Sequence, residues 1–172
     1  MRLETARLVI RSIQPGDGDA WVSMLSDPRV RRFLPPFPEV TLESFDDVIA
    51  RRRKREHELG YTIWAVALKQ TDEMIGQCGL LPAEGKGPEI EVAYHFTSAS
   101  WNKGYATETV VAVLEYAFQS TELNRVIAII MPENIASQRV AEKAGMRFDS
   151  IANYFDIPGL KKYVAERDWW KP

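Results

Sequence analysis

Cysteine is almost absent from this sequence, since Cys78 is the only one in 172 residues. A single thiol excludes an internal disulfide and any metal cluster held by several cysteines, and we expect no metal site. Such sparing use of cysteine is typical of a reducing compartment. We therefore expect a cytoplasmic protein.

Long apolar runs and an excess of positive charge are also missing. The N-terminal MRLETARLVIRSI alternates charged and apolar residues where a signal peptide needs a continuous apolar run, and no later segment is long enough to cross a bilayer. The formal net charge is −2, so no overall basic field attracts nucleic acid or an anionic membrane. We expect neither a membrane nor a nucleic acid as a partner.

The residues that are present suit one folded unit. Hydrophobic residues make up 45% of the chain and charged residues 27%. A chain of this length and composition can bury one sizeable core but is marginal for two. We expect a single domain over residues 1–172.

The order of periodic segments predicts an α/β domain whose sheet is mostly antiparallel at its start, with helices on both faces. Helices are expected over residues 15–26 and 42–58, over about 104–121, and over 134–144, with Gly60 and Gly145 as stops. Strand-like runs occupy residues 7–13, 61–68, 73–81, 89–96, 125–131, 147–155 and 161–170.

The stretch SWNKGYATET at residues 100–109 joins a strand-like run to the long apolar helix. The amides of a helix start lack partners within the helix and carry a partial positive charge, which makes this position suited to phosphate. Gly104 and Ala106 are small enough to let a ligand approach the backbone. The alternative is an ordinary loop in which Gly104 only relaxes strain, and a lone glycine turn usually has that role.

The run RRRKR at residues 51–55 could indicate an anion-binding patch. However, helical i, i+4 spacing places acidic residues opposite the basic ones, which favours a salt-bridged helix face exposed to solvent. The expected pairs are Asp47 with Arg51, Arg52 with Glu56, and Lys54 with Glu58.

Three segments, EIEVAYHF, WNKGYATE and NIASQRVAEKAGMRF, resemble in order and spacing the GNAT superfamily of acyl-CoA N-acyltransferases. The chain is more narrowly similar to the branch of the ribosomal-protein N-terminal (RimJ/RimL-like) acetyltransferases, whose members commonly begin as this chain does with LETARLVIR. The resemblance implies a mixed, mostly antiparallel sheet of about six to seven strands with one splayed pair. It also implies acetyl-CoA as the acyl donor.

In this family a loop binds the pyrophosphate of coenzyme A through its amides, and the family pattern falls on Trp101, Gly104 and Ala106. Trp101 departs from the usual Gln or Arg but agrees with the branch, and Asn102 stands where many members have Gly. The resemblance therefore implies a cofactor loop made of Trp101, Asn102, Lys103, Gly104, Tyr105, Ala106 and Thr107. Lys103 and Arg139 flank it and are candidates for the adenosine phosphates.

The resemblance also assigns the strand before the loop, which in the family carries a bulge and pairs with the pantetheine arm. The backbones of Ala93, Tyr94, His95 and Phe96 would do so here. The second family motif falls on Asn134, expected at the pantetheine, and on Ser137, expected at the sulfur. Both have ordinary alternatives, because Asn134 is a good helix cap and Ser137 a common first-turn residue.

Attack of an amine on a thioester needs a base for the ammonium proton, donors for the developing oxyanion, and stabilisation of the departing thiolate. Alternation along EIEVAYHF places Glu91 and His95 on the face opposite Ile90 and Tyr94. Glu91, at the usual glutamate position of the branch, is the candidate base, acting through water, and an exposed strand carboxylate is an equal alternative. His95 is the second candidate for the base, and the amide near Tyr94 is the candidate oxyanion donor.

A hydroxyl is much less acidic than a thiol, so Ser137 is assigned a hydrogen bond to the sulfur, not full acid catalysis. No tyrosine matches the position of the acid that many members use. The amine stays open between a protein N-terminus and a small molecule, as does a monomer or a homodimer. An acyl-CoA sensor without turnover is the alternative to an enzyme.

Overall fold

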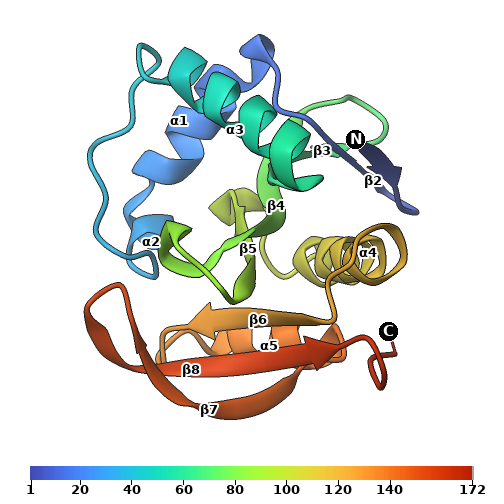
Figure 1. The fold of residues 1–172 in the computed structure, drawn as a ribbon. Coiled ribbons are helices and arrows are strands. Elements are labelled where there is room, and N and C mark those ends of the chain that lie inside the picture. Colours follow the sequence, from blue (N-terminus) through green and yellow to red (C-terminus); the bar gives the residue numbers. More distant parts are fainter. Residues whose placement is uncertain (172) are drawn as a thin grey trace.

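A computed structural model describes residues 1–171, and its centre is one eight-stranded sheet (Figure 1). The strands lie in the order β1-β2-β3-β4-β5-β6-β8-β7. Their bounds are β1 Arg2–Glu4, β2 Leu8–Arg11, β3 Ile63–Leu68, β4 Met74–Pro82, β5 Ile90–Phe96, β6 Arg125–Ile130, β7 Arg147–Tyr154 and β8 Ile157–Glu166.

Strands β5 and β6 are the only parallel neighbours in this order, and they separate soon after they meet. They pair at one position, with Glu91 opposite Ile127, whereas β4 and β5 stay paired over the whole of β5. Every other neighbouring pair is antiparallel. The sheet therefore opens between β5 and β6, as the expected splayed pair requires.

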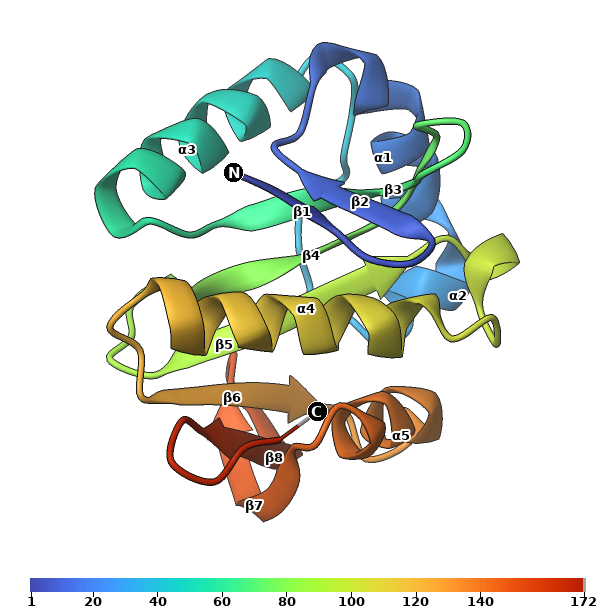
Figure 2. The ribbon, with the colours of Figure 1, turned by 90° about the vertical axis from the view of Figure 1, so that its right-hand side faces the viewer.

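Helices cover both faces of the sheet (Figure 2). On one face lie α1 (Gly18–Ser26), the short α2 (Pro28–Arg31) and α3 (Phe45–Leu59), packed on a core that includes Trp21, Phe45 and Met74. On the other lie α4 (Tyr105–Ser120) and α5 (Ile135–Lys143), whose apolar residues join the larger core. None of the helices within residues 1–171 combines the length and apolar character that a membrane span needs.

The predicted order of elements is confirmed, with differences at the ends. The three-residue β1 was not predicted, and it raises the number of strands to eight. Helix α2 was also missed, because four residues are too few for a helical period to show. The last strand begins at Ile157 and ends at Glu166, so Trp169 and Trp170 lie beyond it instead of at its end.

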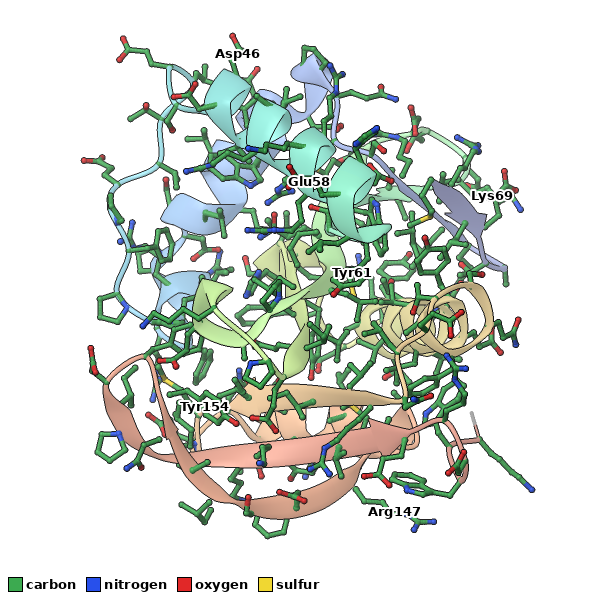
Figure 3. The ribbon with its side chains drawn as sticks, in the orientation of Figure 1. Asp46, Glu58, Tyr61, Lys69, Arg147 and Tyr154 are labelled. Carbon is green, nitrogen blue, oxygen red and sulfur yellow. The ribbon has the colours of Figure 1, made fainter. Side chains whose placement is uncertain are left out.

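The expected salt-bridged face of α3 is mostly wrong. Of the three expected pairs only Lys54 with Glu58 forms, with 3.8 Å between Nζ and Oε1. Glu56 instead accepts hydrogen bonds from the N-terminal amine and from Trp64 on β3. Arg52 turns inward to Gln77 on β4. Figure 3 labels two acidic residues of this helix, Asp46 near its start and Glu58 near its end.

Candidate functional site

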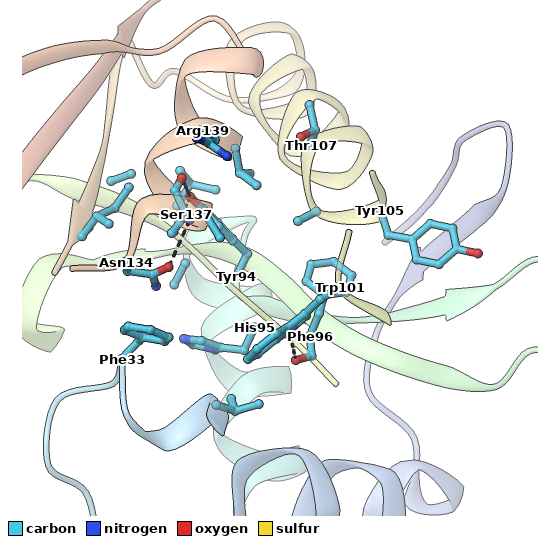
Figure 4. A pocket seen from close by; sticks show the side chains of 18 of the residues that line it. Phe33, Tyr94, His95, Phe96, Trp101, Tyr105, Thr107, Asn134, Ser137 and Arg139 are labelled. Carbon is cyan, nitrogen blue, oxygen red and sulfur yellow. Dashed lines mark hydrogen bonds between the residues drawn. The ribbon is translucent and has the colours of Figure 1, made fainter. Parts of the chain in front are cut away.

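A cavity of about 510 Å³ opens where β5 and β6 separate (Figure 4). Four parts of the chain line it: β5, the loop and first turn of α4 at residues 100–107, the end of β6 with the start of α5, and the α2 region. Three of these contain the motifs found in the sequence. The fourth, with Val30, Phe33 and Leu34, comes from the segment after α1.

The backbone of β5 presents free hydrogen-bonding groups to this cavity. Hydrogen bonds from Ala83 N to Glu89 O and from Thr97 N to Ile75 O bracket the antiparallel ladder with β4. Because alternate residues bond across such a ladder, the amides of Glu91, Ala93 and His95 face β4. The Val92 amide faces β6, where the pairing of Glu91 with Ile127 uses it, and the amides of Tyr94 and Phe96 face the opening. The register is unbroken from Ile90 to Phe96, so the bulge that the resemblance implied on this strand is not found.

Trp101 closes one end of that free edge. Its indole Nε1 donates to the carbonyl oxygen of Phe96 at 3.0 Å, and the residue, which lines the cavity, is 39% exposed. This bond occupies the Phe96 acceptor and leaves the Tyr94 amide and carbonyl as the free pair nearest the middle of the cavity. The departure of Trp101 from the general family pattern thus has a structural role.

Two left-handed residues shape the loop before α4. Gly104 is the N-cap, with φ of 79°, and Asn102 has φ of 61°. Asn tolerates this region better than most side chains, which explains why it can stand where many members have Gly. No side chain caps the helix, so the amides of Tyr105, Ala106 and Thr107 have no partner among residues 1–171 and point out of the helix start.

Arg7 on the N-terminal hairpin braces this loop, which sequence reasoning missed. Its guanidinium is bound to Glu108 with 2.7 Å between Nη2 and Oε2, donates to the Lys103 carbonyl at 2.9 Å, and lies over the Tyr105 ring. The Tyr105 side chain accordingly points away from the cavity in Figure 4. Lys103 does not line the cavity.

The start of α5 brings the second motif to the cavity. The Asn134 side chain accepts a hydrogen bond from the Ser137 amide at 3.1 Å, so it caps the helix. Its amide nitrogen has no partner in the described part of the chain. The Ser137 hydroxyl donates to the Tyr94 hydroxyl at 2.9 Å, and Tyr94 donates to the Ser137 carbonyl at 3.0 Å. Burial raises the pKa of the Tyr94 phenol above its usual range, so it stays protonated.

Glu91 is a buried carboxyl at the point where β5 and β6 part. It is 8% exposed, lines the cavity, and has no hydrogen-bond partner among residues 1–171. Burial raises its pKa from 4.5 to about 8, because a charged carboxylate is poorly solvated there. This placement excludes the exposed strand carboxylate that the sequence left open.

His95 lies on the same face of β5, and its imidazole points toward Phe33 (Figure 4). Its Nδ1 lies 3.0 Å from the Gln77 side-chain nitrogen. Burial, with the nearby Arg52 charge, lowers its pKa from 6.5 to about 4. A ring of such low basicity is a poor acceptor for an ammonium proton, so the structure favours Glu91 over His95 as the base.

The predicted site residues are brought together with one exception. All of them except Lys103 line the cavity. Sequence reasoning missed Val30 and Lys143, which also line it, together with Arg7 behind the loop. Phe33 and Leu34 add an apolar part to the cavity wall. Arg7 and Lys143 lie inside the segments LETARLVIR and NIASQRVAEKAGMRF, but the motifs gave them no role, and Val30 lies outside every motif.

Comparison with known proteins identifies the family. The description "Acetyltransferase (GNAT) domain" matches residues 7–147. The chain belongs to the GNAT acetyltransferase family. It is an acyltransferase, and members of this family use acetyl-CoA as the acyl donor.

Individual GNAT proteins resemble the whole chain. The uncharacterized N-acetyltransferase YnaD of Bacillus subtilis (strain 168) is 31% identical over 173 residues, covering 99% of this chain and 92% of its own. A GNAT-family acetyltransferase from Bacillus anthracis superposes with a TM-score of 0.82 at 26% identity, covering 98% of this chain and all of that one.

A more distant solved structure shares the fold alone. The ribosomal L7/L12 α-N-protein acetyltransferase RimL, in complex with coenzyme A, has a TM-score of 0.81 at 14% identity and covers 98% of this chain and 99% of its own.

Proposed function

We propose that the protein transfers an acetyl group from acetyl-CoA to a primary amine, by direct attack while both substrates are bound. The observation that carries the proposal is Glu91, a buried carboxyl of raised pKa that lines the same cavity as the free β5 amides. A base with a pKa near the working pH is what deprotonation of an ammonium needs. The continuous sheet supports a single catalytic domain for residues 1–172.

The residues of the cofactor half fit coenzyme A. The free amides of Tyr105, Ala106 and Thr107 would hold the diphosphate, and Arg139 with Lys143 would add positive charge from the facing helix. The Tyr94 carbonyl and the Phe96 amide would pair with the pantetheine arm, and the free Asn134 nitrogen would donate to it. Bound acetyl-CoA supplies the activated thioester carbonyl.

The acetyl-accepting half supplies the proton transfers. Glu91 would take the ammonium proton through a water molecule. The Tyr94 amide would donate to the carbonyl oxygen on which negative charge develops. The Ser137 hydroxyl would turn from Tyr94 to the departing sulfur, and Tyr94, which stays protonated, would keep the serine backbone in place.

Two amine classes remain as acceptors, a protein N-terminal α-amine and a small-molecule amine. The RimL neighbour, whose described target is the ribosomal protein L7/L12, is an example of the first class. The wall formed by Val30, Phe33 and Leu34 is apolar in either case.

A panel of amines tests the proposal. Thiol release from acetyl-CoA should exceed background hydrolysis with at least one N-terminal peptide or small amine, and acetyl-CoA should raise the melting temperature because it binds the folded state. An acyl-CoA sensor would give the thermal shift without turnover. Absence of both effects at saturating acetyl-CoA would refute the proposal.

A further inference from the structure

A chain of buried polar side chains leads from α3 along one face of the sheet to the cavity. The Gln77 carbonyl oxygen accepts from Arg52 Nη2 at 2.6 Å and from Trp21 Nε1 at 3.1 Å. The Gln77 nitrogen lies 3.0 Å from His95 Nδ1. Gln77 and Trp21 are each 5% exposed. Neither Arg52 nor Gln77 belongs to the sequence motifs that line the cavity.

The donors around Gln77 determine the protonation state of His95. Arginine and tryptophan side chains donate hydrogen bonds and cannot accept them, so the oxygen of the Gln77 amide must face Arg52 and Trp21. The nitrogen then faces His95 and can only donate. Nδ1 of His95 is therefore the acceptor, and the proton of the neutral ring is on Nε2.

Charge and burial oppose the other states of the ring. An imidazolium would place a second donor against the Gln77 nitrogen, close to the charge of Arg52. The pKa of Arg52 is lowered by burial to about 9, so its guanidinium remains charged at neutral pH. Its Nη1 is buried without a hydrogen-bond partner in the described chain, which keeps that charge poorly compensated.

The position of His95 places its Nε2–H beside the apolar wall to which Phe33 belongs. The ring lines the cavity and points toward Phe33, and Nε2 has no partner within residues 1–171. Glu91 and His95 share a face of β5 with Ala93 between them, so their Cα atoms are about 13 Å apart at about 3.3 Å per residue. The small Ala93 side chain leaves space between a carboxyl at one end and a fixed donor at the other.

We propose that Arg52, Trp21 and Gln77 hold His95 with its proton on Nε2, and that this Nε2–H donates a hydrogen bond to an oxygen of the amine substrate. The substrate class is then a primary amine that carries a carbonyl or hydroxyl oxygen close to the nitrogen, with an apolar substituent against Phe33. This assignment rests on the proposed acetyl transfer and deepens it. His95 is a specificity residue, and Gln77 and Arg52 are positioning residues.

Nitrogen-15 NMR of the two histidines tests the protonation state without turnover. The chain contains only His57 and His95, so His57→Gln assigns the spectrum. We expect His95 to carry its proton on Nε2 and to stay neutral from pH 5.5 to 8. Gln77→Glu replaces the donor by an acceptor and should protonate Nδ1. A wild-type ring protonated on Nδ1 at neutral pH would overturn the proposal.

Kinetics with two matched amines test the role of the donor. Leucinamide carries a carbonyl that 3-methylbutylamine lacks, on the same alkyl group. In His95→Leu the kcat/KM preference for leucinamide should fall by about tenfold, the value of one hydrogen bond, and His95→Gln, which keeps an N–H donor, should restore part of it. Comparing ratios between enzymes cancels the different basicities of the amines.

The outcomes separate this proposal from the proposed function. A preference unchanged in His95→Leu would refute the oxygen contact while leaving acetyl transfer intact. If wild type acetylates no amine, the proposed function fails and the substrate class fails with it, although NMR still decides the state of His95. Should His95→Leu not fold, the Nε2 shift of wild type decides, because leucinamide should move it and 3-methylbutylamine should not.

Discussion

The two halves of the cavity are built differently. The cofactor half consists mainly of backbone groups in short contiguous segments, namely the free edge of β5, the loop with Asn102 and Gly104, and the first turn of α4. The acceptor half consists of side chains from distant elements. Phe33 follows α2, Glu91 and His95 lie on β5, and Gln77 on β4 links His95 to α3.

This difference predicts different responses to change. A backbone site depends on φ angles and small residues, and its affinity should vary little with pH. A site made of a buried carboxyl and a fixed imidazole depends on protonation. Substitutions in one half should therefore leave the function of the other half intact, and the predictions below test this separation.

The largest effect is expected for Glu91→Gln. Loss of the base should lower kcat by about a hundredfold or more, while the Kd for coenzyme A, measured by calorimetry, stays the same. Wild-type kcat/KM should rise with pH and level off above about 8, because the base acts when deprotonated. If the inflection of this pH profile lies at the same pH for amines of different basicity, it reports a group of the enzyme and not the amine. Exposed Glu133→Gln is the control, and an unchanged kcat in Glu91→Gln would remove the base assignment.

Gly104→Ala should weaken coenzyme A binding and leave the acceptor half unchanged. The residue has φ of 79°, and an added Cβ would lie 3.3 Å from Arg7 Nη2. Left-handed strain costs about 1–3 kcal/mol, so coenzyme A affinity should fall by about tenfold. Gly16→Ala, where a Cβ meets nothing within 4 Å, should leave the affinity unchanged. Equal affinities in the two variants would argue against a backbone cradle at Gly104.

Stability against pH tests the burial of Glu91. Its pKa is about 8 in the folded state against a reference of 4.5, so between these values the folded protein binds more protons than the unfolded chain. The free energy of unfolding then falls as pH rises, by about 1.4 kcal/mol per unit. Glutamine does not titrate. Denaturant unfolding should show Glu91→Gln gaining stability over wild type from pH 5 to 8, and a constant difference would contradict the raised pKa.

The smallest effect should separate the two roles of Asn134. Aspartate keeps the capping oxygen but lacks the amide donor, so Asn134→Asp should retain the melting temperature and weaken coenzyme A binding by a few-fold, one hydrogen bond being worth about 1 kcal/mol. Asn134→Ala should lose both, with about 1 kcal/mol of stability. If the aspartate variant binds as tightly as wild type, capping is the only role of Asn134.

The fold and the geometry of the proposed cofactor half were largely predictable because their information is local. Apolar periodicity placed the helices and most strands, and small residues at a strand-to-helix junction indicated the loop around Gly104. The acceptor half was only partly predictable. Arg52 looked like one more charge of an exposed helix, and nothing near Gln77 in the sequence indicated a polar contact to His95.

The sequence by itself determined the order of elements, the uncapped helix start after Gly104 and the cap at Asn134, since each depends on residues a few positions apart. Only the tertiary structure decided that Glu91 is buried without a partner, that His95 meets Gln77 and Arg52, and that Arg7 braces the loop. These outcomes depend on which elements pack together, and burial and charge set the pKa of a side chain only once its neighbours are in place.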